Sequence, residues 1–161
     1  MSIKSINRCK WIVLLLCLCH LSTEAQSSKD KRAQQLFEEE KIEKAIELWE
    51  QSKEEYLSQD DNKEAFRVLM TLGKTVMHQF KVKEAQAYYE QARDLAQEKK
   101  LVMEYGQALN SLTTIYQFNG DQEKAFETCH EILNTPGLNS EFISDAYTTL
   151  ANIYESRLDY E

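Results

Sequence analysis

The stretch Lys81 to Ala96, KVKEAQAYYEQARDLA, predicts one amphipathic α-helix, and its pattern occurs twice more in the chain. A small residue recurs at a forty-residue period, and its neighbours on the same face follow at offsets of three, four and three. This spacing keeps one stripe on a single side of an α-helix. The stripe consists of Ile42, Ala45, Trp49 and Ser52 in the first copy, Val82, Ala85, Tyr89 and Ala92 in the second, and Ala125, Cys129 and Ile132 in the third. Three copies of one helix pattern predict a helical repeat protein.

Other apolar patterns between these copies predict partner helices, and together they form antiparallel hairpins. We predict helices over 31–39, 42–58, 63–79, 83–99, 101–118, 121–134 and 140–157. Only four glycines and one proline occur in 161 residues, which agrees with an all-α chain. Gly73 would cost about 1 kcal/mol relative to alanine in a helix interior, so it indicates that a neighbouring helix approaches too closely for a side chain. Gly120 predicts a left-handed helix end.

Polar segments separate the predicted helices and set the limits of the repeats. Asp61 or Asn62, and Asn139 or Ser140, can cap the helices that follow them. After a polar linker at 26–30, we expect a degenerate first repeat at 31–58, a second at 63–99, a third at 101–134, and the first helix of an incomplete fourth at 140–161.

The last predicted helix would expose an apolar face, because its partner helix is missing from the sequence. Leu150 aligns with Leu72 and Leu112, so the helix opens a fourth copy of the repeat. We therefore expect the sequence to be a fragment of a longer protein. In the alternative, a partner covers this helix, and self-association through 140–157 is one form of that alternative.

The first 25 residues have the pattern of a secretory signal peptide. Lys4, Arg8 and Lys10 precede a short apolar run at 11–19, which is too short to span a bilayer. Small residues at 23 and 25 fit a cut before Gln26. A lipoprotein signal is a weaker reading, because leucine precedes both candidate cysteines, and an uncleaved anchor is the other alternative. The prediction is export, to a periplasmic or extracytoplasmic location.

Composition disfavours several classes of function. The net charge of −8 becomes more negative after the signal is removed, which disfavours nucleic acid as a partner. Cys129 is the one cysteine after the signal, and its place on the inward stripe predicts a small buried hydrophobe. No phosphate-binding loop, paired zinc cysteines or His-Glu-x-x-His motif is present, so we expect no enzyme, no cofactor and no metal site.

These residues resemble the tetratricopeptide repeat (TPR), a helix-turn-helix family. The second repeat carries the resemblance best, through Leu72-Gly73, Ala85, Tyr89 and Ala92. Supporting matches are Ala108, Tyr116 and Gly120 in the third repeat, Leu150, Ala151 and Tyr154 in the fourth, and Ala45 and Trp49 in the first. The chain departs from the family in its longer period and in Phe80 and Glu40, which replace a small residue before the second helix of a repeat. The resemblance implies a TPR-type α-solenoid of about three and a half repeats.

Longer repeats of this kind resemble those of exported bacterial sensor and regulatory proteins, in which a membrane helix and an output domain follow the array. The family binds ligands on the concave surface of the first helices, and this implies a peptide-binding groove. The corresponding positions are Arg67, Met70, Lys74, Met77, Asn110, Thr114, Gln117, Thr148 and Asn152. They do not match the family's two-carboxylate clamp.

Two functions follow from this reading. The first is a non-catalytic scaffold that binds a peptide or protein surface outside the cytoplasm, as the N-terminal portion of a longer signalling or regulatory protein. Contact with the membrane would then come only from the signal segment or a helix beyond the sequence. The alternative is a structural array that packs on its own downstream domain or on another copy.

Overall fold

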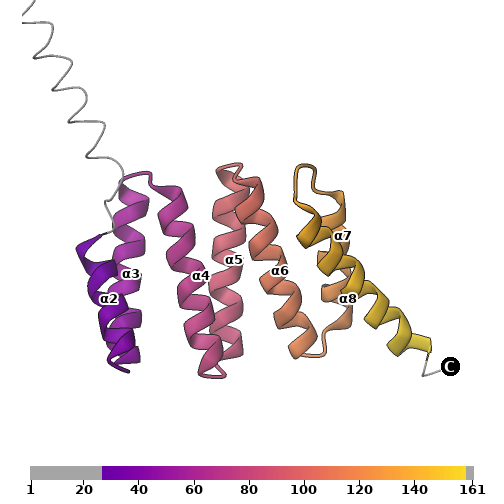
Figure 1. The fold of residues 1–161 in the computed structure, drawn as a ribbon, viewed down its shortest axis with the longest axis horizontal. Helices are drawn as coiled ribbons and strands as arrows, with labels where there is room; N and C mark the ends of the chain where they lie inside the picture. The colour runs from indigo at the N-terminus through magenta and orange to yellow at the C-terminus, as the bar shows by residue number, and fades with distance from the viewer. Residues whose placement is uncertain (1–26, 159–161) are drawn as a thin grey trace, which may run out of the picture.

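The computed structural model describes residues 27–158, and over this range the chain forms seven α-helices. They lie side by side in chain order, each antiparallel to the next, with α2 at one end of the array and α8 at the other (Figure 1). Each helix packs against the next one, and α6 also contacts α8. The helices are α2 Ser28–Glu38, α3 Ile42–Ser58, α4 Asn62–His78, α5 Val82–Glu98, α6 Val102–Phe118, α7 Gln122–Asn134 and α8 Ser140–Leu158. The all-α fold of consecutive helix pairs is confirmed.

From α3 onward, every helix limit lies within one residue of its predicted position. The predicted caps are also resolved: Asp61 accepts a hydrogen bond from the backbone nitrogen of Glu64 at 3.4 Å, and Asn139 accepts one from that of Phe142 at 3.1 Å. None of the helices in the described range is both long enough and apolar enough to cross a membrane.

The prediction of a linker over 26–30 is wrong for residues 27–30, the part of this segment that the structure describes. Ser27 caps α2, its Oγ accepting a hydrogen bond from the backbone nitrogen of Lys29 at 3.3 Å, and Ser28 to Asp30 form the first turn of the helix. The reason is that Asp30 is only 1% exposed and is held by side chains of α3. The predicted signal peptide and Gln26 lie outside the described residues.

Five of the turns share one geometry that recurs every twenty residues. The second residue after each helix end has a left-handed backbone, and the amide of the residue that follows it donates to the carbonyl oxygen five positions earlier, as from Asp121 to Tyr116 at 2.8 Å. This is the Schellman type of helix end. The left-handed residues are Glu40, Asp60, Phe80, Lys100 and Gly120, with φ between 56° and 73°. The left-handed conformation predicted for Gly120 is confirmed, but the other four turns use residues with side chains.

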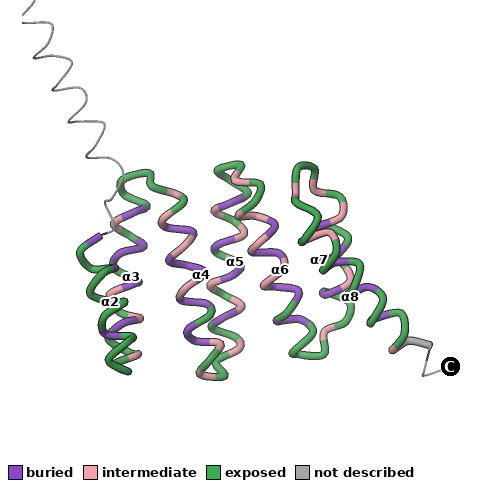
Figure 2. The backbone as a smooth tube through the Cα atoms, viewed as in Figure 1, coloured by how far each residue is buried: buried purple, intermediate pink, exposed green. Residues whose placement is uncertain are grey.

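The predicted inward stripes form the core of the array, which Figure 2 shows as buried segments facing neighbouring helices. Ile42 and Val82 at the starts of the stripes are half-buried. The buried members are Ala45, Trp49, Ser52, Ala85, Tyr89, Ala92, Ala125, Cys129 and Ile132. Cys129 is a free, fully buried thiol, and burial raises its pKa while hydrogen bonds with Thr113 and Thr149 act in the opposite direction. It is therefore the small buried hydrophobe that the sequence predicts.

Candidate functional site

The first helices of the successive pairs, α2, α4, α6 and α8, are joined by polar contacts. Each contact links one of these helices to the next, so that the four helices share one polar side of the array. The links are Asp30 with Arg67, Lys63 with Glu104 at 3.9 Å, and Asn110 with Asp145 at 3.1 Å. The predicted ligand-binding surface is on this set of helices.

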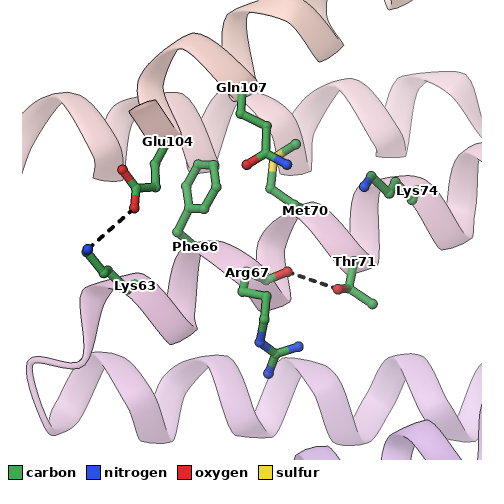
Figure 3. A pocket seen from close by; sticks show the side chains of 8 residues that line it. All are labelled: Lys63, Phe66, Arg67, Met70, Thr71, Lys74, Glu104 and Gln107. Atoms are coloured by element: carbon green, nitrogen blue, oxygen red, sulfur yellow. Dashed lines mark hydrogen bonds and ion pairs between the residues drawn. The ribbon is translucent and has the colours of Figure 1, made fainter. Parts of the chain in front are cut away.

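An open pocket of about 250 Å³ lies between α4 and α6. Figure 3 shows its side chains, with Phe66 and Met70 between the Lys63–Glu104 pair and Lys74. The lining residues are Lys63, Phe66, Arg67, Met70, Thr71 and Lys74 from α4, and Glu104 and Gln107 from α6. The pocket therefore combines three cations with one acid, two apolar side chains and two neutral polar groups.

Arg67 forms one wall of the pocket and is already bound within the protein. Its Nε donates to Glu64 Oε2 at 2.7 Å, and its Nη2 donates to Asp30 Oδ2. Burial acts to lower the pKa of Arg67, but the hydrogen bond to Glu64 and the charge of Asp30 outweigh it and raise that pKa. Arg67 can thus extend the positive field of the pocket, but its guanidinium is largely committed to these two carboxylates.

Lys74 is an exposed cation of the pocket, as Lys63 is, but it has no internal partner among the described residues. Within residues 27–158 its ammonium group has no ion pair or hydrogen bond. An ammonium that has no internal partner can bind an anionic group without first breaking a contact. Lys74 is therefore the group in this pocket best placed to bind a carboxylate of a ligand.

The floor of the pocket is apolar and buried. Phe66 is 4% exposed and Met70 is 3% exposed, and both belong to the core between α4, α5 and α6. Gln107 lies beside Met70 in the pocket (Figure 3). A side-chain amide both donates and accepts hydrogen bonds, so Gln107 can pair with a peptide backbone.

The structure brings only three of the nine predicted residues together in the pocket: Arg67, Met70 and Lys74. Of the two methionines among the predicted positions, Met70 is buried and Met77 packs against the same core cluster. Their tight packing leaves them little freedom to rearrange.

The remaining predicted residues lie on α6 and α8 outside this pocket, and several are engaged by their own helix or its neighbour. Asn110 donates to Asp145, Thr114 Oγ1 donates to the Asn110 carbonyl at 3.1 Å, and Thr148 Oγ1 donates to the Ser144 carbonyl at 2.9 Å. Gln117 and Asn152 are exposed.

Five pocket residues were not among the predicted positions: Lys63, Phe66, Thr71, Glu104 and Gln107. The repeat period carried a signal for two of them. Gln107 stands forty residues after Arg67, and Glu104 forty after Glu64, so the period places them on the matching part of α6. Extending the period from Arg67 would have found Gln107.

A second group of polar side chains, from α3 and α4, surrounds Asp30 of α2. Asp30 accepts hydrogen bonds from Trp49 Nε1 at 3.0 Å, from Tyr56 Oη at 3.2 Å and from Arg67. The backbone nitrogen of Ser27 donates in turn to Tyr56 Oη at 2.7 Å. Both carboxylate oxygens of Asp30 are thus bonded within the protein, so this group supports the fold and leaves the pocket as the candidate site. No three His, Cys, Asp or Glu side chains between residues 27 and 158 are placed to hold a metal ion.

Comparison with known proteins gives a match of the fold. No protein-family model matches the chain, and no curated protein matches it. Among solved structures, the crystal structure of BtubC (BKLC) from P. vanneervenii matches with a TM-score of 0.63 at 16% sequence identity. The match covers 82% of this chain and 56% of that chain, so this chain spans little more than half the length of its structural neighbour. At this identity the likeness shows the fold alone.

Proposed function

We propose that this chain is a TPR-type repeat array that binds an extended peptide segment, in which an acidic residue lies next to an apolar one. The pocket between α4 and α6 carries this proposal, because it combines an unpaired cation, Lys74, with the apolar floor of Phe66 and Met70. The proposed repeat type rests on the resemblance of the second repeat and on the array of consecutive helix pairs.

The chemistry of the pocket favours this ligand over others. An acidic side chain of the peptide would pair with Lys74, and the neighbouring apolar side chain would lie on Phe66 and Met70. The amide of Gln107 would bond to the peptide backbone between them. Nothing in the pocket supplies a nucleophile paired with a base, so the proposal is for binding without catalysis.

Export and a place at the N-terminus of a longer signalling protein belong to the same proposal. They rest on the sequence of residues 1–25 and on the family resemblance. The chain would then bind its peptide outside the cytoplasm.

A peptide library displayed on phage tests the binding proposal directly. We expect the immobilised chain to enrich peptides with Asp or Glu beside a large apolar residue. The Lys74→Glu variant should bind the enriched peptides about tenfold more weakly or worse, because an ionic hydrogen bond is lost and a repulsion is added. Lys83→Glu on the exposed side of α5 is the matched control, since it makes the same charge change away from the pocket.

Three results would contradict the proposal: no enrichment of any peptide, enriched peptides without an acidic residue, or binding that Lys74→Glu and Lys83→Glu reduce equally. The third result would mean that the net charge of the protein, rather than the pocket, selects the peptides.

A further inference from the structure

Glu104 is the one carboxylate among the residues that line the pocket between α4 and α6. It stands in the first turn of α6, and its side chain is 23% exposed. Within residues 27–158 the carboxylate makes a single polar contact, an ion pair with Lys63 at 3.9 Å. A carboxylate has room for about four hydrogen bonds, so Glu104 keeps most of its capacity to accept them.

The preceding repeat shows why this carboxylate is available. Glu64 stands forty residues before Glu104, in the first turn of α4, and it accepts a hydrogen bond from Arg67 at 2.7 Å. In α6, the residue at the place of Arg67 is Gln107, which carries no charge. Glu104 therefore lacks the cation that pairs with Glu64 inside its own helix, and its only ion pair is with a residue of the neighbouring helix in the described part of the chain.

Lys63 is a weak competitor for this carboxylate. Its side chain is 72% exposed, so water can solvate its ammonium group when the pair opens. Ion pairs between exposed groups contribute little to stability, and the distance of 3.9 Å is longer than that of a charge-assisted hydrogen bond. A cationic group of a ligand that donates directly to Glu104 would therefore displace Lys63 at little cost.

Glu104 and Lys74 lie at opposite ends of the pocket, with Phe66 and Met70 between them (Figure 3). Lys63, which is beside Glu104, is separated from Lys74 by about 16 Å along the axis of α4. An extended peptide rises about 3.3 Å per residue, and its long side chains shorten the span, so groups about three to five positions apart can reach both ends. The pocket thus offers two opposite charges at a spacing that one short peptide segment can match.

We infer that Glu104 binds a lysine or arginine side chain of the ligand, so that the pocket selects peptides in which a basic and an acidic residue flank an apolar one. This inference rests on the proposed function, because it adds a second charged contact to the same site. The acidic residue pairs with Lys74, and the apolar side chain lies on Phe66 and Met70. Arginine fits the acidic end best, since its planar guanidinium can donate two parallel hydrogen bonds to one carboxylate.

The peptides that the chain enriches from the phage library provide the first test. We expect a lysine or arginine about three to five positions from the acidic residue, on the far side of the apolar one. In the Glu104→Gln variant, the acidic and apolar preferences should persist and the preference for a base should disappear. Glu43→Gln is the matched control, because Glu43 is an exposed acid in the first turn of α3 and its loss changes the net charge equally.

Synthetic peptides then measure the contact. The most enriched peptide is made with blocked ends, once with its base and once with glutamine in place of the base. In fluorescence anisotropy, Glu104→Gln should weaken the basic version about fivefold relative to the glutamine version. Both versions carry the same acid, so an effect of the released Lys63 on that acid cancels in this comparison. Lys63→Gln should strengthen the basic version relative to the glutamine version, because the internal competitor is gone.

The outcomes separate this inference from the proposed function. Enriched peptides with an acidic and an apolar residue but no base at this spacing overturn the inference and leave the proposed function in place. Equal effects of Glu104→Gln on the two synthetic versions do the same. A preference for bases that Glu104→Gln and Glu43→Gln reduce equally would assign it to the net charge of the protein and would also overturn the inference. The absence of any enriched acidic peptide would overturn both.

Discussion

The ring of Tyr89 in α5 lies directly over Gly73 in α4. A Cβ atom on Gly73 would fall 2.5 Å from Cε1 and 2.8 Å from Cδ1 of that ring. Tyr89 is 5% exposed, so its ring has little room to move aside. The close approach of two helices at this glycine, which the sequence predicts, is therefore confirmed.

Gly73→Ala should destabilise the array even though alanine favours a helix. The helical gain is about 1 kcal/mol, and overpacking against a buried ring costs about 1–3 kcal/mol. We expect a net loss of about 1 kcal/mol in chemical denaturation followed by circular dichroism. In a Tyr89→Leu background the same substitution should become neutral or stabilising, because the ring is gone. Equal or greater stability of Gly73→Ala in the parent chain would contradict the packing argument.

Most of the helix limits follow from the sequence because they depend on local chemistry. The apolar stripe at helical spacing marks each helix, and residues such as Asp61 and Gly120 mark the ends. The burial of Tyr89 and Ala92 also follows from that stripe.

Long-range contacts explain what the sequence did not predict. Asp30 stands in a polar stretch, for which the sequence predicts a linker. Its carboxylate nevertheless accepts hydrogen bonds from Trp49 and Arg67, which are 19 and 37 residues away. The pocket depends in the same way on how α6 lies against α4, so a helical period alone could not show that Met70 is buried in the core. Three of the four left-handed turns without glycine also lacked a local signal, since Glu40, Phe80 and Lys100 rarely adopt that backbone.

Glycine at these turns should stabilise the protein. Phe80 and Lys100 have φ of 60° and 56°, a backbone that costs a residue with a side chain about 1 kcal/mol relative to glycine. Phe80→Gly and Lys100→Gly should therefore each raise the denaturation midpoint, and Gly120→Ala, at φ 73°, should lower it. Gln79→Gly is the neighbouring control, because φ at Gln79 is −87° and glycine gains nothing there. A lower midpoint for Phe80→Gly would show that its side chain stabilises the turn.

Asp30→Ala should be one of the most destabilising single changes in the first pairs of helices. It removes a buried carboxylate that accepts from Trp49, Tyr56 and Arg67 and leaves their donors without this partner. We expect a loss of about 3 kcal/mol, together with a change in Trp49 fluorescence as water reaches the indole.

Arg67→Ala is the comparison for Asp30→Ala. It leaves the hydrogen bonds of Asp30 to Trp49 and Tyr56 in place, and Arg67 is itself 41% exposed, so its removal should cost less. If Arg67→Ala proved as costly as Asp30→Ala, the ion pair between the two residues, rather than the hydrogen bonds to α3, would hold α2 in place.

Alkaline pH should destabilise the array through Tyr105. Burial, and then the hydrogen bond that Tyr105 donates to Glu131, raise its pKa from 10.0 to about 12. Below the ordinary pKa, Tyr105 is protonated in both the folded and the unfolded chain. As the pH rises from 10.0 to about 12, the unfolded chain loses this proton first, so the folded chain binds more protons and stability falls. Denaturation midpoints should therefore decrease through this window, and they should decrease less in Tyr105→Phe, which has no phenol to ionise.

Part of the decrease should persist in that variant, because burial also raises the pKa of Tyr89 and Tyr116. Ultraviolet difference absorbance gives an independent check, since tyrosinate from Tyr105 should form in the folded chain only near the upper end of the window. An identical pH dependence in the parent and in Tyr105→Phe would show that Tyr105 ionises alike in the folded and the unfolded chain.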